Sequence, residues 1–387
     1  MKTILSVCFS FVLILQSIFL QPINTDASEI AISSPSSILV EASTGQIIFE
    51  KNADEKLPPA SVTKIMTLLL IFDALQEHKI KLEDMVTVSE YAASMGGSQV
   101  FFEPGETQNV DTMIKCIAVA SANDACVAIA EHIATTEEEF VKNMNLRAKE
   151  LGMNNTNFVN CNGLDAKQHL TTAKDIALMS RELLVDYPQI HDYSTIWMEN
   201  IIHTTAKGNS EFGLTNTNKL IRQYEYTTGL KTGSTNNAKF CISATAKKND
   251  MELIAVIMAA PDPKTRFADA TSLLNFGFET CSKYIDHQKL KMSPVSIKHG
   301  VKKSVTGELL KPFQYIETTG ADMKQISRKI KLKKELQAPV KKGDQIGEVH
   351  YYIGKTPIGH IPILAKTAVS EINYKTALFQ ILESFFL

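Results

Sequence analysis

The chain has few of the residues that disulfide and metal sites need. Its 387 residues include only six cysteines, none of them in a C-x-x-C pair. Cys8 lies in an apolar N-terminal segment, and the other five have irregular spacings: Cys116, Cys126, Cys161, Cys241 and Cys281. An odd number without a ligand spacing argues against a disulfide framework or a cysteine metal site. We therefore expect buried free thiols, and no metal or other cofactor.

An excess of charge of one sign is also lacking. The formal net charge is −2, so the whole chain shows no attraction for a polyanionic partner. The stretch from Asp286 to Glu348 differs, with 14 Lys and Arg against 7 Asp and Glu. Because the N-terminus predicts export, nucleic acid is not expected as its partner. A solvated face, an anionic membrane surface or a wall polymer fits this stretch better.

A long apolar run is found at the N-terminus. Lys2 precedes a run from Ile4 to Leu15, and Thr25-Asp26-Ala27 offers small residues for cleavage. This pattern predicts a secretory signal over residues 1–27. An uncleaved anchor is the alternative, because the run approaches the length that spans a bilayer. We expect an exported protein at the outer face of the cytoplasmic membrane, in the cell envelope.

The rest of the chain has two regions with different patterns of predicted secondary structure. Up to about residue 285, strand signals at 37–41, 46–50, 239–246 and 253–258 are interleaved with helical runs, listed here: 61–77, 112–119, 125–133, 137–151, 172–184 and 266–284. This pattern predicts an α+β domain over 28–285, with an antiparallel sheet flanked by helices. Residues 286–370 show short period-two stretches, which predict a small all-β domain.

The last segment, 371–387, has the pattern of an amphipathic helix. Lys375, Gln380 and Glu383 share one side of a helical wheel, and apolar residues cover the rest. It is too short and too polar to span a bilayer but suits a membrane interface. Packing against its own domain is the alternative.

The sequence Pro59-Ala60-Ser61-Val62-Thr63-Lys64 starts the first long helical run. Ser61 falls in the first turn, where backbone N–H groups favour a developing negative charge. Lys64 lies one turn further on the same face. Burial against an apolar helix lowers a lysine pKa, so this amine can act as the base for the hydroxyl. An N-cap serine with a surface lysine is the alternative.

Two further motifs follow this pair. Ser121-Ala122-Asn123 lies between two helical runs, and Lys231-Thr232-Gly233 opens a predicted strand pair. S-x-N is common and occurs again at Ser234–Asn236, whereas K-T-G is rare. The order S-x-x-K, S-x-N, K-T-G at these separations makes the set specific.

This arrangement resembles the superfamily of penicillin-binding proteins and serine β-lactamases. The wider sequences resemble the low-molecular-weight D-alanyl-D-alanine carboxypeptidases, at Leu57–Thr67, Ala120–Ala125, Asn216–Leu220 and Gly229–Gly233. That family also has a signal peptide, a C-terminal β-domain and an amphipathic membrane anchor. The resemblance therefore covers nearly the whole chain.

The resemblance implies a role for each motif residue. Ser61 attacks the carbonyl of a D-Ala-D-Ala bond, Lys64 takes its proton, and Ser121 bridges Lys64 and Lys231 and relays a proton to the leaving amine. Asn123 offers its amide to the substrate and to Lys64. Backbone N–H groups of Ser61 and Ser234 hold the oxyanion. The K-T-G strand and the closing helix bind the substrate and its carboxylate, through Lys231, Thr232, Gly233, Ser234 and Arg266. For Arg266, a surface helix cap is the alternative.

The implied partners are a peptidoglycan pentapeptide as substrate, β-lactams as covalent inhibitors, and a membrane surface through the C-terminal helix. A β-lactamase is one alternative, but class A enzymes need a further glutamate for deacylation. The corresponding stretch, Thr156–Asp165, contains no glutamate. A catalytically silent wall-binding protein is the other alternative, and the intact motif set argues against it.

Overall fold

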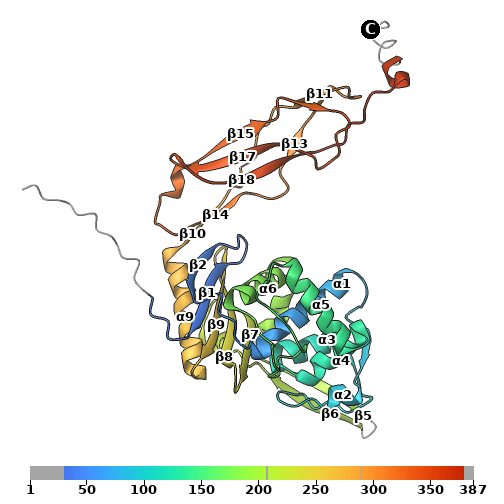
Figure 1. Cartoon of the computed structure of the whole chain (residues 1–387), viewed down its shortest axis with the longest axis vertical. Coiled ribbons are helices and arrows are strands. Elements are labelled where there is room, and N and C mark those ends of the chain that lie inside the picture. The colour runs from blue at the N-terminus through green and yellow to red at the C-terminus, as the bar shows by residue number, and fades with distance from the viewer. Residues whose placement is uncertain (1–29, 206–207, 289, 379–387) are drawn as a thin grey trace, which may run out of the picture. The chain divides into compact units, whose positions relative to one another are not determined.

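A five-stranded antiparallel sheet is the framework of the chain up to about residue 280 (Figure 1). The computed structural model describes residues 30–205, 208–288 and 290–378. The strand order is β2-β1-β9-β8-β7. The strands are β1 (Ser36–Glu41), β2 (Ile47–Lys51), β7 (Thr227–Thr235), β8 (Lys239–Lys248) and β9 (Met251–Ala260). The apolar run at 253–258 is central, as predicted, and β7 is an edge strand whose partner is β8 alone in this sheet.

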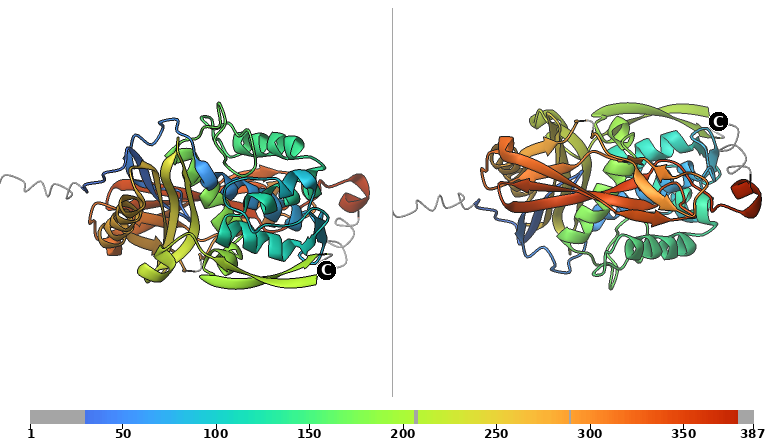
Figure 2. Two further views of the ribbon diagram at one scale, coloured as in Figure 1. Left: turned by 90° about the horizontal axis from the view of Figure 1, so that it is seen from below. Right: turned by 90° about the horizontal axis from the view of Figure 1, so that it is seen from above.

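Helices cover both faces of this sheet. α9 (Pro263–Thr280) packs on one face, and α6 (Ala173–Asp186) packs on the other (Figures 1 and 2). Gly277 lets α9 approach closely, because an added Cβ would lie 2.6 Å from Leu253 Cδ1. α9 starts earlier than predicted because Asp262 caps it, accepting a hydrogen bond from Thr265 N. It ends at Thr280 because the chain then enters another strand.

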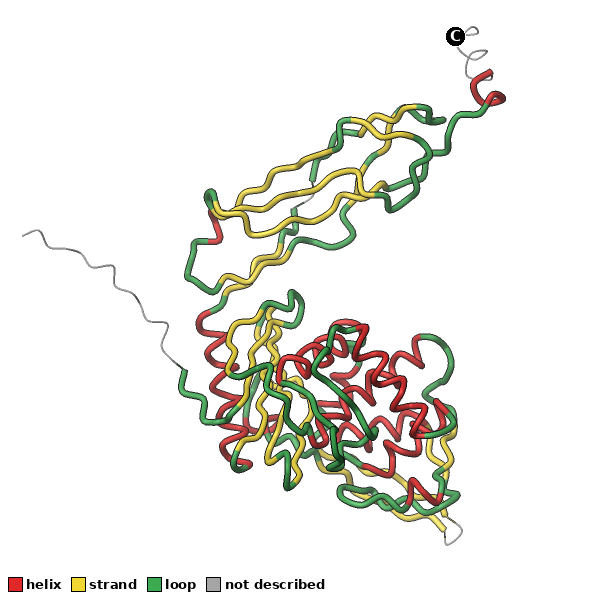
Figure 3. The backbone as a smooth tube through the Cα atoms, in the orientation of Figure 1, coloured by secondary structure: helices red, strands yellow, loops and turns green. Residues whose placement is uncertain are grey.

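A group of helices packs together beside α6 (helices are red in Figure 3). They are α1 (Lys64–Gln76), α2 (Glu90–Ala93), α3 (Val110–Lys115), α4 (Asn123–Ala134), α5 (Glu137–Glu150) and α7 (Ile190–Ser194). The short helix α8 (Leu220–Gln223) packs against β7 instead. A 3₁₀ turn, η1 (Ala60–Thr63), precedes α1, and a π turn, η2 (Cys116–Ala120), joins α3 to the loop before α4. The predicted apolar face of α1 is fully buried.

Two small antiparallel pairs complete this part. β3 (Met85–Thr87) pairs with β4 (Thr107–Asn109), and β5 (Met198–Thr205) pairs with β6 (Gly208–Thr215). The five cysteines among the described residues are all buried free thiols, as expected.

Thr172 and Asp175 form only half of a capping box at the start of α6. Thr172 Oγ1 accepts a hydrogen bond from Asp175 N at the start of α6. The Asp175 carboxylate does not return this bond, because it accepts instead from Asn155 N and Thr156 Oγ1.

The all-β part has its own sheets and its own core. Its four-stranded sheet has the order β13-β18-β17-β15, a three-stranded sheet has the order β12-β11-β16, and β10 pairs with β14. The strands are β10 (Ser282–Ile285), β11 (Val295–Lys298), β12 (Ser304–Val305), β13 (Gly307–Glu308), β14 (Gln314–Glu317), β15 (Ile326–Leu332), β16 (Glu335–Gln337), β17 (Gln345–Ile353) and β18 (Thr356–Ala365). A short 3₁₀ turn, η3 (Met323–Gln325), precedes β15. Buried Phe313 and Tyr351 stack in the core with ring centroids 3.9 Å apart.

The predicted α+β fold followed by an all-β part is confirmed. Since β10 pairs with β14, we propose that the boundary between the two domains lies just before Ser282 rather than at residue 285. The predicted signal, 1–27, lies outside the described residues. Of the predicted C-terminal helix, residues 374–378 are helical, and 379–387 lie outside the described part. Among described helices, none has the length and apolar character to cross a membrane.

Candidate active site

Ser61 and Lys64 lie together at the start of α1. Lys64 Nζ is 3.0 Å from Ser61 Oγ, close enough for a hydrogen bond. Ser61 belongs to η1, and Lys64 is the first residue of α1 with its side chain fully buried. The alternative of a surface lysine is therefore wrong. Ser61 is also not an N-cap, since Pro59 holds that position before η1.

Two further oxygens hold the Lys64 amine. Lys64 Nζ donates to Asn123 Oδ1 and to the Asn162 carbonyl, each at 2.6 Å. Burial lowers the pKa of Lys64, while Cys126, Cys161 and Asp124 act in the opposite direction. Burial disfavours the charged form of an amine. Burial thus makes the neutral form of Lys64, which can accept a proton from Ser61, easier to reach.

Lys231 brings a second buried amine to the same region. It lies on the edge strand β7, is 1% exposed, and donates to the Thr232 carbonyl at 3.2 Å. Burial sets the pKa of Lys231 well below its ordinary value, and the charge of Lys64 lowers it further. Two nearby amines disfavour each other's protonation. The predicted neighbourhood of the two lysines therefore agrees with the geometry.

The S-x-N motif lies where the π turn meets α4. Ser121 is 4% exposed and has a left-handed backbone, with φ 61°. A non-glycine residue in this region is uncommon and costs roughly 1–3 kcal/mol. A bridge from Ser121 to both lysines is absent from the hydrogen bonds of the described residues. Asn123 faces Lys64 with its oxygen, as expected, but its Nδ2 donates to Gly96 O at 2.7 Å.

The K-T-G strand passes close to the serine backbone. An added Cβ on Gly233 would lie 2.8 Å from Ser61 N and 2.9 Å from Val62 N. Only a residue without a side chain allows this approach. β7 starts at Thr227, so Lys231-Thr232-Gly233 lies within the strand and does not open it as predicted. Ser234 follows with its residue exposed at the strand edge.

Arg266 lies behind the K-T-G strand. It is 7% exposed, so the alternative of a surface helix cap is wrong. Its Nη1 donates to Gly233 O at 3.2 Å and to Cys241 O at 3.3 Å, and its guanidinium lies over the Phe267 ring. Burial lowers the pKa of Arg266 to about 10. The arginine therefore places a positive charge against the carbonyl side of β7.

Several residues beside the site were not predicted. The Asn162 carbonyl binds Lys64, and Gly163, with φ +89°, lies so close to Ala60 that an added Cβ would collide with the Ala60 carbonyl. Thr217 Oγ1 is 2.7 Å from Thr232 Oγ1. In the sequence, the glycine at position 163 was a signal for the close contact with Ala60. The contact between Thr217 and Thr232 depends on tertiary packing and has no such signal.

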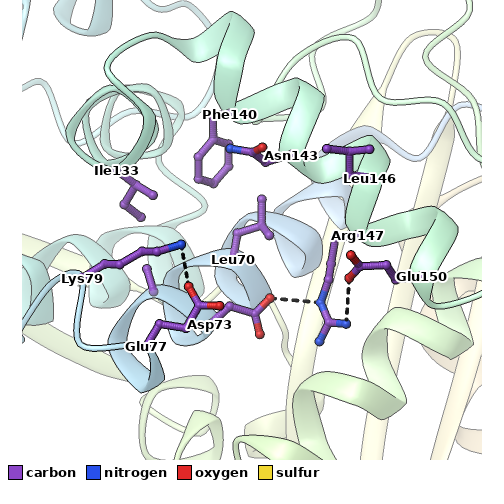
Figure 4. A pocket seen from close by; sticks show the side chains of 11 residues that line it. Leu70, Asp73, Glu77, Lys79, Ile133, Phe140, Asn143, Leu146, Arg147 and Glu150 are labelled. Carbon is purple, nitrogen blue, oxygen red and sulfur yellow. Dashed lines mark hydrogen bonds and ion pairs between the residues drawn. The ribbon is translucent and has the colours of Figure 1, made fainter.

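A separate cavity of about 500 Å³ lies on α1 and α5 (Figure 4). Leu70, Ile133 and Phe140 line its apolar part, and Arg147 is paired with Asp73 at its rim. It contains none of the predicted site residues. Among the described residues, no three His, Cys, Asp or Glu side chains are grouped to hold a metal ion.

The chain also matches known families and proteins. Residues 23–262 match the family described as D-alanyl-D-alanine carboxypeptidase. The chain is 40% identical over 385 residues to D-alanyl-D-alanine carboxypeptidase DacF of Bacillus subtilis, covering 98% of this chain and 97% of that protein. It is 33% identical to DacC of Escherichia coli, covering 86% and 84%.

The chain belongs to the D-alanyl-D-alanine carboxypeptidase family. As in the predicted arrangement, residues 278–371 of this carboxypeptidase-family chain match a C-terminal domain described for penicillin-binding protein 5. The fold is similar to the crystal structure of penicillin binding protein 5 from Haemophilus influenzae, with a TM-score of 0.75 and 29% identity. That match covers 88% of this chain and 98% of the other.

Proposed function

We propose that this chain is a serine-type D-Ala-D-Ala carboxypeptidase that removes the terminal D-alanine from peptidoglycan pentapeptide stems through an acyl-enzyme on Ser61. The observation that carries the proposal is the pairing of Ser61 Oγ with Lys64 Nζ at 3.0 Å. The buried amine has a lowered pKa, which a serine nucleophile needs from its base. Family membership supports the same reaction.

In acylation, Ser61 Oγ attacks the carbonyl carbon between the two D-alanines, and its proton passes to neutral Lys64. The negative charge on the carbonyl oxygen is held by backbone N–H groups of Ser61 and Ser234. The close approach of Gly233 to Ser61 N supports this pairing, because it brings the end of β7 beside the serine backbone. The C–N bond then breaks, and the leaving amine takes the proton from Lys64, relayed through Ser121, so that Lys64 is neutral again.

In deacylation, water attacks the ester carbonyl and gives its proton to Lys64. The Ser61 ester bond breaks, the shortened peptide leaves as a carboxylic acid, and Ser61 Oγ recovers its proton. No metal or cofactor takes part in either half of this cycle.

The substrate's terminal carboxylate is bound at the K-T-G strand. Thr232 carries the hydroxyl that binds it, and Thr217, 2.7 Å from that hydroxyl, orients it. Arg266 adds positive potential from behind Gly233 without leaving its own carbonyl partners. Coulombic attraction of this kind is strengthened in a partly desolvated site.

The test is release of D-alanine from a pentapeptide by the purified protein and its Ser61→Ala variant. Loss of a nucleophile that acts in a unit can cost about 10⁶ in rate. We expect release by the wild-type chain and by the control Ser94→Ala, which changes an exposed serine at the end of α2. A Ser61→Ala variant with near-normal release would refute the nucleophile. No release by the wild-type chain would favour a silent wall-binding protein.

The fate of bound penicillin distinguishes the proposed carboxypeptidase from a β-lactamase. The stretch Thr156–Asp165 lacks the glutamate that speeds deacylation in class A enzymes. We propose that benzylpenicillin acylates Ser61 and is released slowly. Rapid hydrolytic turnover of benzylpenicillin would contradict this.

The location proposed for the chain is the outer face of the cytoplasmic membrane. Residues 1–27 direct export, and residues 371–387 anchor the protein at the membrane interface. The β-domain lies between the catalytic domain and this anchor in the sequence.

A further inference from the structure

Asp124, which follows Asn123, holds a neighbouring loop through hydrogen bonds from the backbone of that loop. Asp124 opens α4 and is 1% exposed. Its carboxylate accepts hydrogen bonds from Val100 N at 3.1 Å, from Phe102 N at 3.2 Å, and from Ala125 N at 3.0 Å. Two of these amides belong to residues 96–102, here called the 96–102 loop. Charge-assisted bonds from a buried carboxylate are among the stronger hydrogen bonds in proteins.

The same loop holds Asn123. Asn123 N donates to Ser98 O, and Asn123 Nδ2 donates to Gly96 O, both at 2.7 Å. Gly97 lies so close that an added Cβ would be 2.9 Å from Asn123 Nδ2. The remaining amide atom, Oδ1, accepts the bond from Lys64. The orientation of the Asn123 amide therefore depends on the shape of this loop.

We infer that Asp124 is a positioning residue: it fixes the 96–102 loop so that the loop keeps Asn123 Oδ1 on the amine of Lys64. This inference rests on the proposed function, since it concerns the same base. Asp124 acts through the loop and Asn123. A small displacement of a catalytic group can cost about 100-fold in rate.

Asp124 also acts on Lys64 through its charge. The groups that face the two residues are Lys231 on β7, Cys126 on α4, Cys116 on the π turn and Cys161 in the loop before α6. The Asp124 charge raises the pKa of Lys64 against the larger, opposite effect of burial. Removing that charge lowers the pKa of the base further.

Asp175 is a matched control that tests whether the role of Asp124 is purely structural. Asp175 lies in the first turn of α6, is 3% exposed, and holds Asn155 N and Thr156 Oγ1 in a neighbouring loop. Burial raises the pKa of both carboxyls. The two aspartates are therefore alike in position and burial, and each holds a neighbouring loop, but only Asp124 holds the loop that contacts Asn123.

The experiment measures the rate constant for acylation by benzylpenicillin in Asp124→Asn and Asp175→Asn, with thermal unfolding of both. We expect about a 100-fold loss in Asp124→Asn and less than a threefold change in Asp175→Asn at similar loss of stability. Equal acylation rates in the two variants would overturn the inference.

The pH dependence of acylation gives a readout that lost stability does not move. Acylation needs neutral Lys64, so its rate rises with pH through the pKa of that amine. We expect the acid limb of Asp124→Asn to move to lower pH, because the charge that raises the pKa of Lys64 is gone, and that of Asp175→Asn to stay in place. An unmoved limb in Asp124→Asn would also count against the inference.

A second pair of variants serves if Asp124→Asn does not fold. Gly97→Ala brings a Cβ against Asn123 Nδ2, whereas Gly105→Ala has nothing within 4 Å. Both glycines have positive φ, +79° and +81°, so both substitutions carry the same backbone strain. Gly97→Ala is expected to slow acylation about tenfold or more and Gly105→Ala to leave it unchanged. Equal rates would overturn the loop coupling.

Failure of the proposed function looks different from failure of this inference. If the wild-type chain does not acylate at Ser61, the function itself is wrong. If the wild-type chain acylates and the two aspartate variants behave alike, only the role of Asp124 is wrong.

Discussion

The two buried lysines differ in the number of partners they hold. Lys64 Nζ lies within hydrogen-bonding distance of Ser61 Oγ and donates to the Asn123 and Asn162 oxygens, whereas Lys231 donates to one backbone carbonyl. Both amines are desolvated, which disfavours their charged forms. The effects of substituting them on stability should therefore differ, although the proposed reaction uses both.

Substitution by methionine tests this difference. In Lys64→Met, the Asn123 and Asn162 oxygens lose their donor, and we expect the free energy of unfolding to fall by about 1–3 kcal/mol. In Lys231→Met, an apolar chain replaces a poorly solvated amine, so the free energy of unfolding should stay level or rise. Urea denaturation measures both, and acylation by penicillin should be lost in both. A Lys231→Met protein less stable than Lys64→Met would contradict the assignment.

His169 gives the fold a pH dependence of known sign. Its Nδ1 accepts from Val159 N at 2.9 Å, so the proton lies on Nε2, 2.8 Å from Thr63 Oγ1. Burial lowers the pKa of His169 from 6.5 to about 4. Between these values the unfolded chain binds a proton that the folded chain does not. The free energy of unfolding therefore falls as the pH drops through this window, by about 3 kcal/mol in total.

His169→Gln removes this titration and keeps a donor for Thr63. We expect its stability to fall less than that of the wild-type chain between about pH 7 and pH 4. Urea denaturation of both proteins across this range isolates the contribution of the histidine, because the carboxyl groups titrate equally in both. Parallel pH curves for the two proteins would show that His169 is not the titrating group.

Among the elements, the turn η1 is held between the end of β7 and the loop before α6. Gly233 approaches Ser61 N from the strand, and Gly163 approaches the Ala60 carbonyl from the loop. Neither approach leaves room for a side chain. The position of the serine backbone is thus set by two glycines that are distant in sequence.

Gly163→Ala should disturb this contact more than an ordinary positive-φ glycine would. We expect a loss of several kcal/mol, because about 1–2 kcal/mol of backbone strain is added to a collision with Ala60. Gly152→Ala, with φ +76° and nothing within 4 Å, should lose only the strain. Thermal unfolding compares them, and penicillin acylation should fall only in Gly163→Ala. Equal stability losses would refute the close contact.

The sequence motifs located Ser61, Lys64 and Lys231 because side-chain chemistry at fixed spacing is visible in a sequence. Periodicity likewise predicted the longer helices, and a continuous apolar run predicted the strand at 253–258. The Asn162 carbonyl could not be predicted, because every residue has a carbonyl and only the fold decides which one faces Lys64. The bonds of Asp124 to Val100 and Phe102 depend in the same way on a loop whose path no local pattern fixes.

In the whole molecule, catalysis and membrane attachment are assigned to separate parts of the chain. The predicted site residues all lie between Ser61 and Arg266, and the all-β part has its own core. The proposed anchor comes after both. Loss of the anchor should therefore leave the reaction intact.

Removal of residues 373–387 tests this separation. We expect the truncated chain to leave the membrane fraction and to release D-alanine at the wild-type rate, because the amphipathic segment supplies the interfacial attachment. Fractionation of cells that express either form measures the first, and the pentapeptide assay measures the second. A truncated chain that still fractionates with membranes would show that the anchor lies elsewhere.

The central claim is that Ser61, activated by Lys64, forms the acyl-enzyme. The most direct measurement is mass spectrometry of the full chain after reaction with benzylpenicillin, followed by peptide mapping. We expect one penicillin per chain, attached to the peptide that contains Ser61, persisting after excess penicillin is removed, and absent in Ser61→Ala. Attachment at another residue, or no attachment to the wild-type chain, would contradict it.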